Sequence, residues 1–316
     1  MPTSTSVSVA AMAGVVALAL SAGAGPTGPV TLSKVEAAKV TAQIEKDRAQ
    51  LQTWLQSDPT SYLAAIARKD FGSSRTLTVG SEIDNDVRVE APGITAHHLR
   101  VTVEGDTFRV MAVDPAAQFQ VKAQDSRGAT VGPSTIGLGR LSLRLSHQGF
   151  PAIIVFDPQS PHLRDYKGLK YFPVDLAYRF ELPLTPNPQP DTIIVMSTRG
   201  NQRRALRVGW CDFLVSGKPH RLEAVRLLEP GIGEHDLSVF FRDATSGKET
   251  YGLGRYVDLK KLPDGLYLLD FNAAYNPACA ISDHFNCPVP SKANNLPIAI
   301  RAGERDARYH APTAER

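Results

Sequence analysis

The sequence predicts a mainly β protein, with two antiparallel β-sandwich or barrel-like modules behind an N-terminal helical hairpin. Apolar residues recur at helical spacing before Gly72, and apolar and polar residues alternate with a period of two after it. Short alternating runs separated by Gly, Asp, Asn and Pro are typical of sandwiches rather than parallel sheets. The 316 residues, 42% hydrophobic and 21% charged, can bury a sizeable core, which excludes global disorder.

The charge balance and motif content exclude several function classes. The 35 basic and 32 acidic side chains are mixed along the chain, and no basic cluster is interleaved with aromatics, so nucleic acid is not an expected partner. The sequence contains no nucleotide-binding glycine loop, no H-E-x-x-H and no G-x-S-x-G motif, and we expect no cofactor. Nothing in the sequence identifies a protein partner.

The N-terminus resembles a signal peptide. The first 33 residues carry no charged side chain, and the apolar run of residues 7–20 is too short to span a bilayer comfortably. Ala22-Gly23-Ala24 then provides a small-residue cleavage site. We expect residues 1–24 to be removed, the protein to be exported to the cell envelope or beyond, and the mature chain to lack a membrane span. An alanine-rich leader without a targeting role and a misplaced start are the alternatives, because no Lys or Arg precedes the run.

Residues 25–70 are predicted to form a linker and two helices. Ser33 and Glu36 match a capping box at the start of the first helix. Asp58 and Pro59 suit the N-cap and first position of the second helix, which stops before Phe71. The apolar positions of the first helix are Val35, Val40, Ile44, Leu51, Trp54 and Leu55.

Two β modules follow, separated by a connector rich in Pro, Gly and aromatic residues. The first module covers residues 71–157, the connector 158–176, the second module 177–305 and a tail 306–316. Glu104-Gly105-Asp106 and Gly217-Lys218 are predicted to be hairpin turns. The expected strands are 75–79, 99–103, 107–113 and 140–146 in the first module, and 192–196, 213–215, 221–228, 237–241 and 267–271 in the second.

Three short segments of the first module resemble the forkhead-associated fold, a β-sandwich whose loops bind phosphothreonine. They are Val79-Gly-Ser81, Asp84-Asn-Asp-Val87 and Ile94-Thr-Ala-His-His98. The family has an Arg where this chain has Ser81, and a Ser-Arg pair where it has Thr95-Ala96. Because the charge-assisted bonds of a guanidinium are missing, the resemblance implies the fold without phosphopeptide binding, and a structural role for His98.

A longer set of segments resembles the domain-of-unknown-function 1684 family. The resemblance covers residues 150–305 and, with the sandwich, nearly the whole mature chain. It carries no assigned activity. The matching segments are Lys167-Gly-Leu-Lys-Tyr-Phe-Pro-Val-Asp175, residues 241–256, residues 269–279, Cys287-Pro-Val-Pro290 and residues 295–304.

The segment from Asp243 to Glu304 gathers the side chains from which polar sites are built. An arginine fork can hold an anion, carboxylates can act as acid or base, and amides and tyrosines can orient and stack on a ligand. Each residue also has a structural interpretation: the 243–248 segment suits a turn, and Asp270 could pair with Arg255. The candidates are Asp270 and Glu249 for catalysis, and Arg255, Tyr256, Asn272, Tyr275 and Asn276 for ligand binding.

Cys279 and Cys287 lie eight positions apart in the sequence and could close one local disulfide in an oxidising compartment. A zinc site would need about four ligands, and only Asp283 and His284 lie nearby, so no metal site is expected. Two free thiols are the remaining alternative.

These observations favour a binding module of the cell envelope for a small polar or anionic ligand. A hydrolase acting on an envelope component is the second hypothesis, with Asp270 or Glu249 as base and His284 and Cys287 as possible participants; it would need a carboxylate of perturbed pKa in a cleft. A structural or protein-interaction protein is the third, and an exposed apolar patch on the helices would support it.

Overall fold

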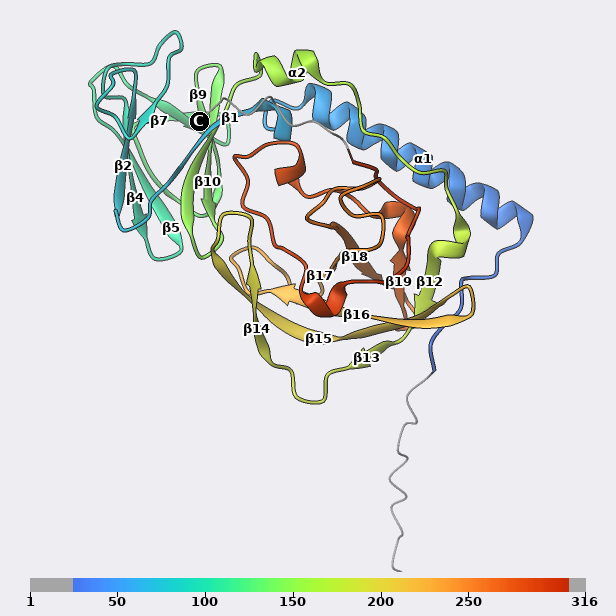
Figure 1. Cartoon of the computed structure of the whole chain (residues 1–316). Coiled ribbons are helices and arrows are strands. Elements are labelled where there is room, and N and C mark those ends of the chain that lie inside the picture. Colours follow the sequence, from blue (N-terminus) through green and yellow to red (C-terminus); the bar gives the residue numbers. More distant parts are fainter. Residues whose placement is uncertain (1–24, 307–316) are drawn as a thin grey trace, which may run out of the picture.

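The computed structural model describes residues 25–306, and the predicted signal peptide lies outside this range. The chain is mainly β, as predicted, with one long helix and three sheets (Figure 1). Two sheets form the first module, and one strongly curved sheet forms the second. Within residues 25–306, no helix is both long and apolar enough to cross a bilayer.

The predicted capping box starts the helix α1 (Lys34–Ser57). The Ser33 hydroxyl accepts the Glu36 N–H at 3.3 Å, and the Glu36 carboxylate accepts the Ser33 N–H at 2.9 Å. The helix ends at Asp58, whose N–H bonds the Trp54 carbonyl. It runs along the second module, beside the connector (Figure 1).

The predicted second helix is wrong. Asp58 accepts the Thr60 N–H at 2.7 Å, but only the short 3-10 turn η1 (Tyr62–Ala64) follows. The chain then enters strand β1 (Ala65–Asp70), which pairs with β11 (Pro151–Phe156) at the edge of the first module. Pairing with a formed sheet outweighs the weak local preference for helix. The first module therefore begins at Ala65 rather than at residue 71.

The first module is a sandwich of a six-stranded and a five-stranded sheet that share one hydrophobic core. Phe108 and Leu143, from the two sheets, are both fully buried in that core. The predicted turn at Gly105 joins β4 to β5. The first sheet has the order β1-β11-β10-β9-β6-β7 and the second β3-β2-β4-β5-β8. The strands are β2 (Thr76–Gly80), β3 (Val87–Arg88), β4 (Leu99–Glu104), β5 (Thr107–Ala112), β6 (Phe119–Val121), β7 (Gln124–Ser126), β8 (Gly128–Val131), β9 (Ser134–Leu138), β10 (Leu141–His147) and β11 (Pro151–Phe156).

The connector holds the short helix α2 (Pro161–Asp165) and leads through η2 (Leu176–Tyr178) into the second module. This module is an eight-stranded, nearly closed sheet around a phenylalanine-rich core. Its order is β12-β19-β18-β17-β16-β15-β13, with β14 also paired to β15. The strands are β12 (Arg179–Leu182), β13 (Leu184–Pro186), β14 (Thr192–Met196), β15 (Gln202–Val215), β16 (Lys218–Leu227), β17 (Leu237–Phe241), β18 (Arg255–Lys261) and β19 (Tyr267–Asp270).

Loops after β19 cover one side of the second module and contact both α1 and the first module (Figure 1). They contain the 3-10 turns η3 (Phe271–Ala273), η4 (Ala278–Ala280) and η5 (Lys292–Asn294). Two hydrophobic clusters join the parts: Leu55 of α1 packs with Ile281, and Ile154 of β11 packs with Phe285. The loops that carry the predicted site residues therefore lie where the helix and the two modules meet.

Candidate functional site

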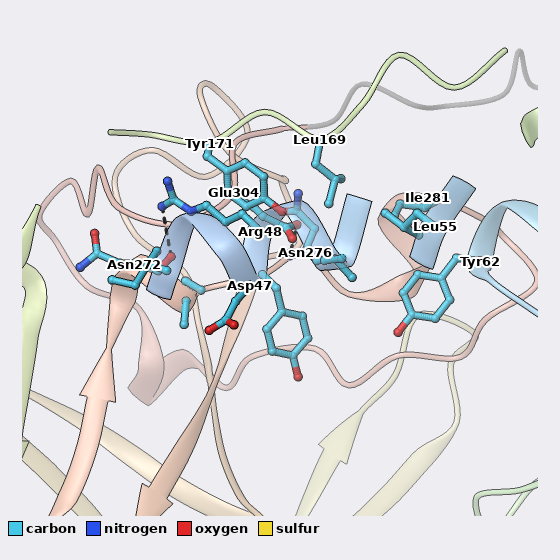
Figure 2. Close-up of a pocket in the computed structure, with 15 residues that line it drawn as sticks. Asp47, Arg48, Leu55, Tyr62, Leu169, Tyr171, Asn272, Asn276, Ile281 and Glu304 are labelled. Carbon is cyan, nitrogen blue, oxygen red and sulfur yellow. Dashed lines mark hydrogen bonds between the residues drawn. The ribbon is translucent and has the colours of Figure 1, made fainter. Parts of the chain in front are cut away.

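A pocket of about 370 Å³ lies between α1 and the loops after β19. Figure 2 shows its two ends: Arg48, Tyr171, Asn276 and Glu304 gather at one, and Leu55, Tyr62 and Ile281 at the other. One end is polar and largely buried, and the other is apolar. Asp47, Arg48, Tyr171, Asn272, Asn276 and Glu304 supply its polar groups, and Ile44, Leu51, Leu55, Tyr62, Leu169 and Ile281 supply much of its apolar lining.

The connector fastens α1 over the pocket. Gln52 donates to the Leu169 carbonyl at 3.2 Å, and its side-chain oxygen accepts the Leu169 N–H at 3.0 Å and the Tyr166 hydroxyl. Tyr166 and Leu169 also pack against Leu55. Because these bonds involve both backbone and side chains, the wall formed by α1 is held in a fixed position.

Arg48 links the helix to two loops at the polar end. One terminal nitrogen donates to the Phe172 carbonyl and the other to the Asn272 carbonyl, each at 3.2 Å. The guanidinium also lies 4.6 Å from the centre of the Tyr171 ring, within range of a cation–π contact. Its Nε is buried without a partner in the described chain. Arg48 thus positions the pocket wall and still has one donor to offer.

Glu304 and Asn276 form the closed, polar end, with exposed fractions of only 2% and 3%. The Glu304 carboxylate accepts the Asn276 N–H at 2.8 Å, and the Asn276 side-chain nitrogen donates to the Arg305 carbonyl at 2.8 Å. The side-chain oxygen of Asn276 is buried and has no partner among residues 25–306. A buried acceptor without a donor costs about 1–3 kcal/mol, so this atom marks a place where a ligand donor would be stabilised.

Burial raises the pKa of the Glu304 carboxyl to about 7, from an ordinary value of 4.5. The Asn276 N–H and the charges of Arg255 and Arg48 oppose this rise, and the nearby Tyr171 hydroxyl adds a smaller opposing effect. Loss of hydration disfavours the charged form more than these groups favour it. At neutral pH the pocket therefore contains a carboxyl group that can take up or release a proton.

A glycine lets the chain bring Glu304 into place. Gly303 has a φ of +78°, and a Cβ there would lie 2.5 Å from the Ala274 carbonyl oxygen and 2.6 Å from that of Phe271. Both the left-handed conformation and the close approach require glycine. The following N–H, of Glu304, donates to the Ala274 carbonyl at 2.8 Å.

Three of the five predicted ligand-binding residues line this pocket: Asn272, Tyr275 and Asn276. The Asn272 amide is fully used inside the protein, since it donates to Asp175 and Asp270 and accepts the Asp175 N–H. The Tyr275 hydroxyl donates to Asp258 at 3.0 Å. Of the three, only Asn276 has a side-chain polar atom without a partner among residues 25–306.

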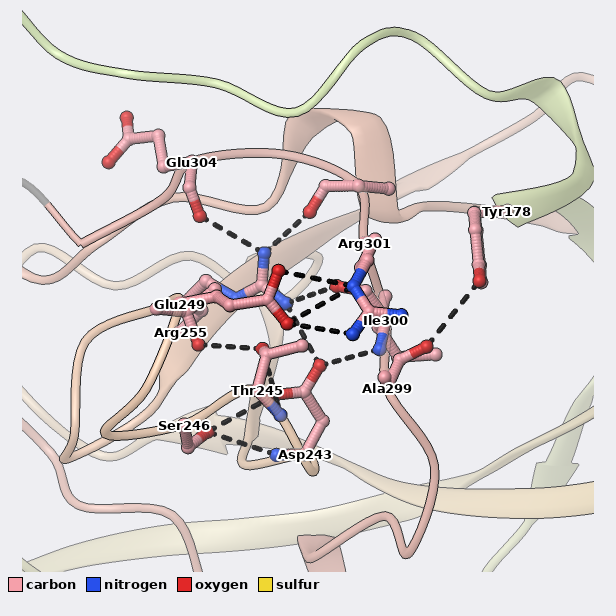
Figure 3. Close-up of polar contacts among 12 residues, drawn as sticks. Tyr178, Asp243, Thr245, Ser246, Glu249, Arg255, Ala299, Ile300, Arg301 and Glu304 are labelled. Carbon is pink, nitrogen blue, oxygen red and sulfur yellow. Dashed lines mark hydrogen bonds and ion pairs between the residues drawn. The ribbon is translucent and has the colours of Figure 1, made fainter.

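Arg255 lies outside the pocket and is 1% exposed. Its terminal nitrogens donate to the carboxylate of Asp243 at 3.1 Å and to the carbonyls of Ile300, Ala302 and Glu304. Figure 3 shows the Glu304 carbonyl facing Arg255 while its carboxylate points away. All four N–H groups of these nitrogens are used, so Arg255 holds the 300–304 segment and has none of them left for a ligand.

Tyr256, the fifth predicted binding residue, lines a different cavity and donates its hydroxyl to the Pro288 carbonyl. The two predicted catalytic carboxylates also lie outside the pocket. Asp270 pairs with Arg179, rather than with Arg255, and accepts the Asn272 N–H at 2.9 Å. Glu249 lies at the surface beside Arg301, at 2.9 Å (Figure 3). Neither is placed to act on a molecule in this pocket.

Sequence reasoning did not select Arg48, Tyr171 or Glu304. A signal existed for Arg48, because it follows Ile44 by four residues and so falls on the apolar face of α1. Tyr171 and Glu304 lie inside the segments that carry the family resemblance, but no spacing connects them. They meet only because residues 303–306 run back beside residues 170–172, through N–H bonds from Phe172 to Gly303 and from Arg305 to Lys170.

The structure contains Cys279 and Cys287 as free, adjacent thiols, so the predicted disulfide is absent from it. The Cys279 N–H donates to the Cys287 sulfur at 3.3 Å. Within residues 25–306, no group of three His, Cys, Asp or Glu side chains could hold a metal ion.

The loops with forkhead-associated resemblance lie on the first module, where His98 is buried. Its ring accepts the Thr95 N–H at 3.1 Å and lies 3.0 Å from the Gln118 carbonyl oxygen. Ser81 contributes its backbone N–H to the Thr95 carbonyl. These contacts hold the loops together inside the sandwich.

The fold and its pocket define a mainly β protein with a cavity of small-molecule size. Residues 164–305 match the model of the family described as "Protein of unknown function (DUF1684)". The matched range includes Tyr171, Asn276 and Glu304, whereas Arg48 lies before it.

Nine chains of solved structures match this chain, including the following two. One is the solution NMR structure of an uncharacterized protein of Haloarcula marismortui, with 37% identity over 48% of this chain and 82% of that chain and a TM-score of 0.39. The other is Mycobacterium tuberculosis EmbR in complex with a low-affinity phosphopeptide, with 14% identity over 40% of this chain and 32% of that chain and a TM-score of 0.21. No curated protein matches the chain.

Proposed function

We propose that the protein binds a small molecule in the pocket between α1 and the loops after β19. The observation that carries the proposal is the unpartnered, buried side-chain oxygen of Asn276 beside the Glu304 carboxyl. The Asn276 oxygen accepts hydrogen bonds, and the Glu304 carboxyl accepts them when it is ionised. Both lie at the closed end of a cavity whose other end is apolar. A mostly apolar pocket with a few convergent polar groups is the usual form of a ligand site.

The chemistry of the closed end favours a particular ligand class. The side-chain oxygens of Asn276 and of ionised Glu304 suit a hydroxyl, an amide N–H or an ammonium group. An anionic group would be repelled by the ionised carboxylate, which is populated at neutral pH because the pKa of Glu304 is about 7. Leu51, Leu55 and Ile281 suit an apolar body. The ligand is therefore a small polar molecule with a hydrogen-donating end and an apolar remainder.

A thermal-shift screen of residues 25–316 tests this proposal. The panel contains matched amphipathic molecules that end in a hydroxyl, an ammonium, an amide or a carboxylate. A donor-ended compound at about 100 times its Kd should add about 2.7 kcal/mol of stability, a rise in Tm of roughly 5 °C or more. Asn276→Ala should reduce this shift. If no donor-ended compound raises Tm, or if only carboxylates do, the proposal fails.

Hydrolysis of an envelope component is the second candidate function, and the pKa of Glu304 favours it. A carboxyl group with a pKa near neutrality in a pocket can serve as general acid or base. Mass spectrometry of the compounds that shift Tm distinguishes the two functions. Products that form with the wild type and not with Glu304→Gln would identify an enzyme, whereas unchanged compounds leave a binding protein.

The third hypothesis, a protein-interaction surface on the helical segment, receives little support. Among the described residues, the exposed large hydrophobic side chains include only Val35 from α1. The apolar face of α1 instead contributes to the pocket.

We also propose that the protein is exported and that Cys279 and Cys287 become oxidised there. The apolar leader before an Ala-Gly-Ala site supports export, and the close approach of the two cysteines supports a disulfide. Intact-mass measurement of protein recovered from the envelope and the medium tests both statements. The expected mass is that of a chain beginning near Gly25 and lacking two hydrogens. A full-length, reduced chain would contradict them.

A further inference from the structure

A second cavity, of about 340 Å³, lies at the junction of the two modules. One wall is the outer face of the six-stranded sheet, where Arg68, Arg144 and Ile154 are neighbours across β1, β10 and β11. The opposite wall comes from β15 to β17 and from residues 277–288. This cavity is separate from the polar end formed by Glu304 and Asn276, although Tyr62 and Tyr275 line both.

Arg144 is a half-buried cation without a counter-ion in this cavity. It makes no hydrogen bond or ion pair with any residue from 25 to 306, and its guanidinium lies 4.9 Å from the centre of the Phe156 ring. Burial lowers the pKa of the Arg144 guanidinium, which means that its charge is held at a cost. The pairing of β10 with β11 fixes the backbone of Arg144 at the wall of the cavity.

The other charged groups of the lining are paired with one another or with neighbours. Arg68 bonds the Asp70 carboxylate at 2.7 Å. Arg203 bonds the Glu229 carboxylate at 2.5 Å and is almost fully buried. The lining therefore has three arginines against one carboxylate, and Arg144 supplies the charge that remains available.

Asn286 also lines this cavity and has one side-chain donor without a partner among the described residues. It is 4% exposed, and its side-chain oxygen accepts the Arg199 N–H at 3.3 Å. Its side-chain nitrogen is buried and has no partner within the described residues. A buried amide N–H and a guanidinium fork are the groups that bind carboxylate and phosphate oxygens.

We infer that this junction cavity binds the carboxylate or phosphate group of a small organic anion through Arg144 and Asn286. The apolar part of the anion packs on Ile154, Phe240 and Phe285, which also line the cavity. The site does not depend on the proposed function, because the polar groups of the two cavities are different. The junction cavity offers the hydrogen-bond donors of Arg144 and Asn286, whereas the closed end of the pocket under α1 offers mainly acceptors.

Titration calorimetry with phenyl phosphate and benzoate tests the inference, with benzyl alcohol as the neutral probe. The proteins are the wild type, Arg144→Gln, Arg144→Lys and Arg100→Gln, an exposed arginine on the other sheet of the same module. At least one anion should bind the wild type and Arg100→Gln equally. Its Kd should be larger by roughly tenfold or more in Arg144→Gln, since hydrogen bonds to charged groups contribute about 1.5–3 kcal/mol.

Arg144→Lys should give an intermediate Kd, because it keeps the charge and loses the fork. Circular dichroism confirms that each variant is folded. The inference is overturned if neither anion binds the wild type, if benzyl alcohol binds as well as the anions, or if Arg144→Gln binds them with unchanged affinity. The preference between the two anions decides between a carboxylate and a phosphate.

Discussion

Arg255→Met is expected to lower the free energy of unfolding by about 3–5 kcal/mol, which is the usual loss when one partner of a buried ion pair is removed. The substitution leaves the Asp243 carboxylate buried without its counter-ion. It also removes the donors from the Ile300, Ala302 and Glu304 carbonyls, which tie the C-terminal segment to β18. Urea denaturation followed by circular dichroism measures the change.

Arg301→Met is the matched control for this prediction. Arg301 is 60% exposed in its side chain and pairs with Glu249, which belongs to the same loop as Asp243. A surface pair contributes about 1 kcal/mol or less, so this variant should lose little stability. Equal, small losses in the two variants would show that the Arg255 interactions do not hold the C-terminal segment.

Glu304→Gln is expected to remove a pH dependence of stability. The pKa of Glu304 is raised from 4.5 to about 7 in the folded state, so between these values the folded chain holds a proton that the unfolded chain has released. The free energy of unfolding of the wild type must therefore fall as pH rises through this window. At about 1.4 kcal/mol per pH unit, the total is on the order of 3 kcal/mol.

The measurement is the difference in unfolding free energy between the wild type and Glu304→Gln at several pH values from 4 to 8. As pH rises, the wild type should lose stability relative to Glu304→Gln. Glu249→Gln is the control, because the Arg301 side chain lowers the pKa of the Glu249 carboxyl and its contribution fades as pH falls instead. If the unfolding free energies of the wild type and of Glu304→Gln change in parallel from pH 4 to 8, the result would contradict the raised pKa of Glu304.

Local sequence signals predicted the elements that local interactions control. The capping box at Ser33 and the hairpin turns at Gly105 and Gly217 are present as predicted. The second helix failed because its signal, at Asp58 and Pro59, is sufficient for one turn only. The strand that pairs with this segment, β11, lies more than eighty residues further along the chain, and no residue near Ala65 indicates this pairing.

The strand β15 shows a second reason for failure. Only residues 213–215 were predicted, whereas the strand runs from Gln202 to Val215. Its pairing with β16 shifts register between Arg207 and Gly209, which interrupts the alternation that marks a strand. Gly209 is needed there, since a Cβ would lie 2.3 Å from the Thr185 carbonyl oxygen of β13.

The sequence could indicate some of the pocket residues by their side-chain chemistry, but not which of them the fold brings together. Asn276 was selected because its loop is rich in polar side chains, and it does line the pocket. Arg255 was selected because a guanidinium can bind an anion. In the structure it is buried and bonds Asp243 and three backbone carbonyls, and residue type alone does not reveal this burial. Glu304 gains its raised pKa from a fold that brings residues 48, 171, 276 and 304 together.

The most direct test of the pocket is a calorimetric titration of the donor-ended compound with the largest thermal shift. Leu51→Trp fills the pocket from α1, and Ala42→Trp adds the same side chain on an exposed position of the helix. We predict binding to the wild type and Ala42→Trp with equal Kd, weaker binding to Asn276→Ala by roughly tenfold, and none to Leu51→Trp. Equal affinity for all four proteins would place the ligand elsewhere and contradict the proposed site.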